Sequence, residues 1–225
     1  MSFYLVEKIP LNSILSMPQI LEIVDKSFKQ QGEGKALNVP RRRMHLPNGL
    51  ILGMLPGAAP QFNSIGVELY CDGKPVTDNR DERETLVLYD SSTGKLEGVL
   101  IGCYINSIRT GAMGGIGTKY LARENAEVLG IIGTGLTARP LVEAISAIRP
   151  IKLAKAYSPT KRNREQFCRD MAEQIPSCEF RVCSRADEAV VGADILAVAT
   201  SSQKPVVEAD WLSPGTHITS VANGD

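Results

Sequence analysis

The sequence predicts an α/β protein whose C-terminal half is a Rossmann-type, doubly wound parallel sheet, preceded by a smaller α+β domain. Two observations lead to this fold class. Residues 127–138 form an apolar run of strand length that meets the pattern Gly-x-Gly-x-x-Ala and then an amphipathic segment. From residue 108 onward, helix-like and strand-like segments alternate, which is typical of right-handed βαβ units. We therefore expect a first domain at 1–108 and a nucleotide-binding domain at 109–225.

The composition is that of an ordinary globular protein, with 225 residues, 43% hydrophobic and 22% charged. Lys plus Arg equals Asp plus Glu at 25 each, so no net charge favours nucleic acid. No apolar run approaches the roughly 20 residues of a membrane span, and Glu7 and Lys8 interrupt the N-terminal stretch, unlike a signal peptide. Five cysteines without metal or redox spacing indicate reduced thiols, a cytoplasmic protein and no metal.

The first domain is expected to be rich in strands and to contain one helix. Ser16 is a predicted helix cap, because proline lies in the first turn and glutamine follows three residues after the cap. Gly32 and Gly34 end this helix. Turn residues such as Pro47-Asn48-Gly49 separate the strands that follow. These strands are expected at 41–46, 50–55, 64–70, 85–89 and 96–104.

The second domain is expected to open with a helix at 109–123 that contains four glycines. Each costs up to about 1 kcal/mol of helix propensity relative to alanine, so we expect tight packing on this helix, at a contact between domains or subunits. The elements expected after it are a strand and helix around the glycine turn, strand 152–157, helix 161–175, strand 179–182, a short helix opened by Ser184, and strands 194–200 and 217–221. Because such a domain normally continues into another helix, we expect the chain to be a fragment of a longer protein.

The glycine pattern predicts a dinucleotide site. Gly133 makes the tight turn, and Gly135 lets the backbone approach a diphosphate. The backbone N–H groups around Thr134, Leu136 and Thr137 then face the anion at the start of the helix. The alternative is an ordinary glycine-rich turn in another kind of α/β protein.

The end of the second strand favours NADP(H) over NAD(H). An acidic residue there would bind the ribose hydroxyls of NAD, but the chain has Ser158, Thr160, Lys161 and Arg162, which suit a 2′-phosphate. Alternatively, the two cations merely open an exposed helix. Thr200 follows an apolar strand at the edge where ligands bind in such sheets, so we expect it on the nicotinamide side; capping the next turn is an equally ordinary role.

Several blocks in order along nearly the whole chain resemble the ornithine cyclodeaminase/mu-crystallin family. They are Val39-Pro40-Arg41, Leu46-Pro47-Asn48-Gly49, Thr93-Gly94-Lys95-Leu96, Ile108-Arg109-Thr110-Gly111-Ala112, the cofactor block, Gly192-Ala193-Asp194-Ile195 and Trp211 through Ile218. The resemblance implies a substrate and dimerisation domain, a Rossmann domain, and a C-terminal segment that returns to the first domain and would lie beyond residue 225. It also implies a homodimer that binds NAD(H) or NADP(H) and an amino or imino acid.

The resemblance further implies that Arg109 holds the substrate carboxylate and that Arg41 assists, with Arg43 on the same strand face. Independently, Arg109 is expected to open a helix, where a cation is poorly placed against the helix dipole unless it serves an anion. Its planar fork matches the two oxygens of a carboxylate. The alternatives are an interface salt bridge for Arg109 and a solvated charge run for residues 41–43.

Two positions depart from the family pattern. The substrate-site lysine of the family falls on Glu68, which would repel a carboxylate by about 4 kcal/mol at 4 Å and an effective dielectric of 20. Glu68 would instead pair with a substrate amine or with Arg43, or it is a solvated strand residue. The catalytic aspartate of the family is matched by Asp225, one position late, and an ordinary loop residue is the alternative.

The sequence therefore predicts an oxidoreductase that uses NADP(H) and acts on an amino or imino acid, as ketimine reductases and amino-acid dehydrogenases do. One alternative is an ornithine cyclodeaminase that releases ammonia with catalytic NAD. Another is a non-enzymatic, NADP-dependent protein that binds a small ligand in the manner of mu-crystallin. No nucleic-acid or membrane partner is expected.

Overall fold

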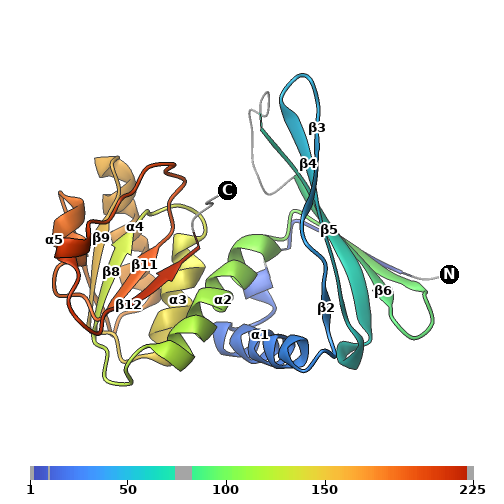
Figure 1. Ribbon diagram of the computed structural model, residues 1–225, viewed down its shortest axis with the longest axis horizontal. Coiled ribbons are helices and arrows are strands. Elements are labelled where there is room, and N and C mark those ends of the chain that lie inside the picture. Colours follow the sequence, from blue (N-terminus) through green and yellow to red (C-terminus); the bar gives the residue numbers. More distant parts are fainter. Residues whose placement is uncertain (1–2, 10, 74–82, 222–225) are drawn as a thin grey trace. The chain divides into compact units, whose positions relative to one another are not determined.

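The computed structural model describes residues 3–9, 11–73 and 83–221, which form two compact units (Figure 1). The first unit consists of Met1–Leu15 and Asp25–Ile105, and the second of Ser16–Val24 and Asn106–Asp225. The first half of helix α1 (Met17–Gly32) thus belongs to the second unit, which the expected division at residue 108 did not anticipate.

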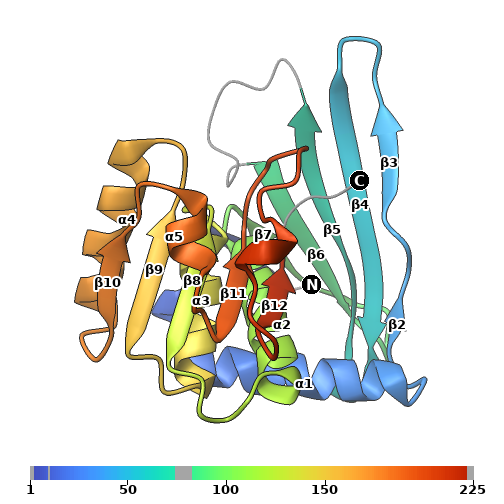
Figure 2. The same ribbon diagram turned by 60° about the vertical axis from the view of Figure 1, so that its left-hand side comes forward.

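A seven-stranded sheet forms the first unit, in the order β1-β7-β6-β5-β4-β2, with β3 also paired to β4 (Figure 2). All pairs are antiparallel except the edge pair β1 and β7, which is parallel. The strands are β1 (Tyr4–Glu7), β2 (Leu37–Asn38), β3 (Arg42–His45), β4 (Leu50–Ala59), β5 (Ser64–Gly73), β6 (Glu84–Asp90) and β7 (Leu96–Ile101). The five strands expected from the sequence are confirmed, whereas β1 and β2 were not predicted.

Helix α1 begins as predicted. The backbone N–H and the hydroxyl of Ser16 both donate to the side-chain oxygen of Gln19, at 2.9 Å each. This satisfies a donor that the first turn of a helix leaves without an intrahelical partner. Beyond the last residue of the helix, Gly34 takes a positive φ of 70°, which glycine adopts without steric cost.

A five-stranded parallel sheet forms the second unit, in the order β10-β9-β8-β11-β12 (Figure 2). The chain runs outward from the central β8 to β10, then returns to β11 on the other side, so the sheet is doubly wound as predicted. Its strands are β8 (Val128–Ile132), β9 (Leu153–Tyr157), β10 (Glu179–Val182), β11 (Ile195–Val198) and β12 (His217–Ser220). Its helices are α2 (Ile105–Leu121), α3 (Ala138–Ile148), α4 (Lys161–Gln174) and α5 (Ala186–Val190).

The core of the second unit lies between this sheet and its helices. Leu129 and Ile131 of β8, Leu141 and Ile145 of α3, and Phe167 of α4 are fully buried. Alternating burial is absent from β8 and β11 because a parallel sheet is covered on both faces.

The glycines of α2 allow this helix to pack closely against α3. A Cβ atom at Gly111 would lie 2.5 Å from the carbonyl carbon of Pro140, and one at Gly115 would lie 2.7 Å from Cβ of Ala144. The predicted tight packing is therefore confirmed. Its predicted place, a contact between domains or subunits, is wrong for these glycines because α2 and α3 belong to the same unit. At Gly117, by contrast, a Cβ would meet open space.

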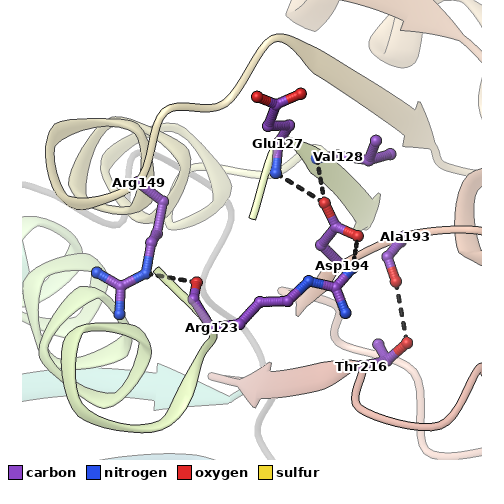
Figure 3. A network of polar contacts seen from close by, with 7 residues as sticks. All are labelled: Arg123, Glu127, Val128, Arg149, Ala193, Asp194 and Thr216. Atoms are coloured by element: carbon purple, nitrogen blue, oxygen red, sulfur yellow. Dashed lines mark hydrogen bonds and ion pairs between the residues drawn. The ribbon is translucent and has the colours of Figure 1, made fainter. Parts of the chain in front are cut away.

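A polar network ties β8 to β11 at the ends where these strands begin (Figure 3). The carboxylate of Asp194, just before β11, accepts hydrogen bonds from the backbone N–H groups of Glu127 (2.7 Å) and Val128 (2.9 Å). It also forms an ion pair with Arg123. These contacts hold the two strands in register at the edge opposite the glycine turn.

Arg149 fastens the end of α2 to the end of α3 (Figure 3). Its buried guanidinium donates to the carbonyl oxygen of Arg123 at 2.9 Å, and to those of Thr118, Lys119 and Ala122 at 2.8–3.1 Å. The last carbonyls of a helix lack intrahelical donors and carry its negative dipole end, so a cation is well placed there.

All five cysteines are free thiols. Burial raises the pKa of Cys168 and of Cys178 to about 11, so these two thiols stay protonated at neutral pH. Across the described ranges, none of the helices has the length and apolar character that a membrane crossing requires.

We predict that His217 makes stability depend on pH. Burial, together with the charge of Arg149, lowers the pKa of this imidazole below 6.5. Below that value the unfolded chain binds more protons than the folded one, so the free energy of unfolding should fall as the pH drops from 7 towards 5. His217→Gln should flatten this dependence in urea unfolding. An unchanged slope in His217→Gln would contradict the assignment.

Candidate nucleotide and substrate site

The glycine turn joins the ends of three strands. Gly133 follows β8 with a positive φ of 96°, and a Cβ atom here would lie 2.2 Å from the carbonyl oxygen of Ala199, beyond β11. Its N–H donates to the carbonyl oxygen of Tyr157, the last residue of β9, at 2.9 Å. Only glycine fits this backbone. The turn therefore lies where the strand order reverses, the place at which doubly wound sheets bind ligands.

Gly135 has a different environment from Gly133. A Cβ atom at Gly135 would meet nothing within 4 Å, so the fold itself does not require glycine there. Thr137 precedes α3, but its side chain makes no capping hydrogen bond to the first turn of that helix. A helix start that its own cap residue leaves uncovered, beside an open glycine, fits the diphosphate of a dinucleotide.

Two hydroxyl groups connect the glycine turn to the loop after β9. The hydroxyl of Thr134 donates to that of Ser158 at 2.9 Å, and the hydroxyl of Ser158 lies 3.4 Å from the carbonyl oxygen of Thr160. Ser158 is buried, whereas Thr160 is exposed. The structure thus brings three of the predicted cofactor residues together at one end of the sheet.

The two predicted cations are less well placed than these hydroxyls. Both Lys161 and Arg162 are exposed, and Lys161 forms an ion pair with Glu165 at 3.8 Å along the same helix face. Their role towards a 2′-phosphate stays a prediction. Arg164 was not predicted as a site residue, and its guanidinium donates to the carbonyl oxygen of Ser158 at 2.8 Å. It also lies 5.7 Å from the centre of the Tyr157 ring.

Arg164 could have been found from helical spacing. It follows Lys161 by three residues, so the two share a helix face near the strand end where Ser158 lies. Because its hydrogen bonds hold the backbone of Ser158, Arg164 fixes the loop that would contact the adenosine ribose.

Thr200 lies next to the glycine turn, as a Cβ atom at Gly133 would be 3.1 Å from its backbone nitrogen. Its hydroxyl accepts a hydrogen bond from the backbone N–H of Ser202 at 3.1 Å, which is the turn-capping role. Contact with a nicotinamide stays a prediction.

The position of Arg109 in its helix differs from the expectation. Helix α2 begins at Ile105, so Arg109 lies in the second turn and does not open the helix. The expected effect of the helix dipole on Arg109 is therefore wrong, because that effect fades within the first turn. The guanidinium donates to the side chains of Asn106 (2.6 Å) and Thr110 (3.3 Å), which orient it along the helix.

Arg41 and Glu68 belong to the first unit, where Arg41 directly precedes β3, Glu68 lies in β5, and β4 pairs with both of these strands. Glu68 of β5 lies opposite Leu55 of β4, and Arg42 of β3 lies opposite Met54 of β4. Arg41, one residue before Arg42, therefore lies level with Leu55 and Glu68. Residues in one row point to the same face, and two strand spacings separate these two by about 10 Å. Arg41 is exposed, but Glu68 is only 7% exposed, so the alternative of a solvated Glu68 is wrong. Glu68 is not without an interaction partner there.

The predicted site residues thus divide between the two units. The second unit contains the glycine turn, Ser158, Thr160, Thr200 and also Arg109, while the first contains Arg41 and Glu68. Asp225, the candidate for the catalytic carboxylate, lies outside the described residues.

Fold and turn together define a chain with a Rossmann-type nucleotide-binding unit. The model of the ornithine cyclodeaminase/mu-crystallin family matches residues 4–225, so the chain belongs to this family. It is 30% identical over 214 residues to an alanine dehydrogenase of Archaeoglobus fulgidus, covering 94% of this chain and 64% of that protein. The chain therefore spans a little less than two thirds of this relative.

Two solved structures share the fold. A Δ1-pyrroline-2-carboxylate reductase of Thermococcus litoralis, in complex with NADH and L-proline, has a TM-score of 0.89 and 30% identity. The match covers 97% of this chain and 68% of that one. An archaeal alanine dehydrogenase dimer with bound NAD has a TM-score of 0.85 and 29% identity, covering 97% and 67%.

The two glycines of the turn should respond differently to alanine. Gly135→Ala should leave the melting temperature within about 2 °C of wild type, because its Cβ meets no atom of the protein. It should weaken nucleotide binding at least tenfold by occupying the space of the diphosphate. Gly133→Ala should destabilise the fold by several kcal/mol, since its Cβ overlaps a carbonyl oxygen. Thermal unfolding and nucleotide titration measure both effects; unchanged affinity in Gly135→Ala would contradict the site.

Proposed function

We propose that the protein is an oxidoreductase that uses NADP(H) and acts on an amino or imino acid, in the manner of ketimine reductases and amino-acid dehydrogenases. The observation that carries the proposal is the glycine turn, which is open at Gly135 and borders the carboxyl ends of β8 and β11. The alanine dehydrogenase and the pyrroline-carboxylate reductase described above, both about 30% identical, support the reaction class.

In this proposal the protein orients the substrate and provides the charged groups that bind it. A bound nicotinamide would supply the hydride chemistry. The guanidinium of Arg109 would bind the substrate carboxylate through two parallel hydrogen bonds, and Arg41 would add positive charge. Asp225 would exchange protons with the reacting nitrogen.

Glu68 is the residue that shapes the substrate class. Its carboxylate would favour a substrate with a cationic amine or iminium nitrogen, and it would disfavour a second carboxylate nearby. Burial strengthens both effects, because a buried charge is screened less than an exposed one. We therefore favour a substrate with one carboxylate and a basic nitrogen.

The preference for NADP(H) rests on the loop after β9. Ser158 and Thr160 offer hydroxyl groups, and no acidic residue occurs in the segment from 158 to 164. Arg164 and the exposed Lys161 and Arg162 make this loop positive, which suits a 2′-phosphate. The dimer reported for the archaeal alanine dehydrogenase supports a homodimer here.

Three measurements on the purified protein distinguish the candidate functions. Steady oxidation of NADPH with cyclic imino acids supports the reductase. Release of ammonia from ornithine without a net change in nicotinamide absorbance supports a cyclodeaminase. Nucleotide binding without either activity supports a ligand-binding protein, for which the replacement of the family lysine by Glu68 is the specific argument. Failure to bind either nucleotide at millimolar concentration would overturn all three.

Arg109→Ala should abolish turnover, with kcat/KM at least 100-fold lower, because the substrate carboxylate loses its bidentate partner. The Kd for NADPH should stay within a few-fold of wild type. Arg109→Lys should recover part of the loss, since it restores the charge without the planar fork. Stopped-flow or steady-state kinetics and fluorescence titration provide the readouts. If Arg109→Ala instead lost nucleotide binding, the residue would belong to the cofactor site.

Ser158→Asp should invert the cofactor preference. A carboxylate at this position would accept hydrogen bonds from ribose hydroxyls and repel a 2′-phosphate. The ratio of kcat/KM for NADPH to that for NADH should fall at least tenfold. Ser158→Asn, which lacks the charge, is the matched control and should change the ratio less. An unchanged ratio in Ser158→Asp would show that the loop after β9 does not bind the 2′-phosphate of NADPH.

A further inference from the structure

A backbone-to-backbone contact between α2 and α3 lies beside two predicted functional elements. Gly111 of α2 meets backbone atoms of α3, where a Cβ would be 2.5 Å from the carbonyl carbon of Pro140 and 2.6 Å from the nitrogen of Leu141. Pro140 is the third residue of α3, directly after the glycine turn. Arg109 lies two residues before Gly111 on α2. The contact therefore joins the helix of the carboxylate-binding arginine to the first turn of the nucleotide-binding helix.

We propose that Gly111 is a positioning residue that sets the distance between Arg109 and the bound dinucleotide. The inference rests on the proposed function, in which Arg109 holds the substrate carboxylate. Because both partners at this contact are helix backbones, the separation of the two helices has a fixed lower limit that no side-chain rotation can relax. A glycine at position 111 lets the two backbones approach more closely than any other residue would.

An added methyl group at Gly111 has no room unless the helices separate. Its Cβ would have to move from 2.5 Å to an ordinary contact distance, which shifts α2 by about 1 Å relative to the glycine turn. Arg109 moves with α2, since two residues of one helix form a rigid unit. A displacement of this size in a group that orients a substrate can lower the rate about 100-fold.

The anchoring of α2 elsewhere supports a positioning role. Its C-terminal end is held by the four hydrogen bonds that Arg149 donates to the carbonyl oxygens of residues 118, 119, 122 and 123, and Gly115 packs on Ala144 one turn beyond Gly111. Between these two glycines, a Cβ atom at Gly114 would be 2.4 Å from Cδ1 of Leu141, so α2 packs closely on α3 along its length. Both helices belong to the same unit, so the spacing is a property of that unit alone.

Two other glycines of α2 provide matched controls. Gly115→Ala adds the same methyl group to the same helix face, with 2.7 Å to Cβ of Ala144, but one turn further from Arg109. Gly117→Ala adds it to open space and should raise the melting temperature, because alanine is the better helix former. Neither glycine touches the predicted site.

The experiment compares the three variants in the purified protein by melting temperature, the Kd for NADPH, and kcat and KM for a cyclic imino acid. Gly111→Ala should lower kcat/KM by 10- to 100-fold while the Kd for NADPH stays within about threefold. Gly115→Ala should lower the melting temperature by a similar amount and kcat/KM by no more than about threefold. An equal loss of kcat/KM in both variants would overturn the proposal, because general loosening of the unit would then explain it. So would unchanged kinetics in Gly111→Ala.

A crystal structure of NADPH-bound Gly111→Ala provides a readout that does not depend on turnover. After superposition on residues 128–138, Cα of Arg109 should shift by about 1 Å from its wild-type place. The absence of a shift overturns the positioning role even if the protein proves to be inactive. The proposed function fails separately, if wild type turns over no amino or imino acid.

Gly111→Ala is also made together with Gly117→Ala, whose expected stabilisation offsets part of the packing loss. Failure of this double variant to fold, while Gly115→Ala folds, would also overturn the proposal. The contact would then sustain the fold and not the geometry of the site.

Discussion

The second unit depends on one close backbone approach, between Gly133 after β8 and the Ala199–Thr200 peptide after β11. The positive φ at Gly133 turns the chain out of the strand and into α3 at the point where the order of strands reverses. A side chain at this position would separate the two strand ends. The same approach leaves the start of α3 beside the open position at Gly135. One steric constraint thus creates both the fold and the place where an anion can bind.

The opposite end of that sheet, where the strands begin, contains charged side chains instead of an open glycine turn. There, Asp194 and Arg149 close the structure with charged groups that are satisfied by backbone donors and acceptors (Figure 3). Buried charges are tolerated where hydrogen bonds compensate for lost hydration. One end of the sheet is therefore closed by polar networks, and the other carries the glycine turn and the hydroxyl groups predicted to bind the cofactor.

Most helices and strands could be predicted, because the sequence pattern of each element lies within the element or next to it. The cap at Ser16, the glycine turn and strand β10 are examples. The features that were not predicted depend on partners in other parts of the sequence. Strand β1 is defined by parallel pairing with β7, a partner far along the chain. The role of Arg164 requires the end of β9 beside it, and the burial of Glu68 requires its neighbouring strands. The start of α2 was placed at residue 109, whereas the helix begins at Ile105.

The membership of Ser16–Val24 in the second unit has a consequence for how the chain folds. Leu21 fills the space beside Gly115, and its side chain would lie 3.0 Å from a Cβ atom there. A segment near the N-terminus therefore completes the packing of helices that are synthesised much later. Contacts of such long sequence separation slow folding, because the intervening chain must close a large loop. During translation this early segment has to wait for its partners, and its apolar face is a natural target for chaperones in the interval.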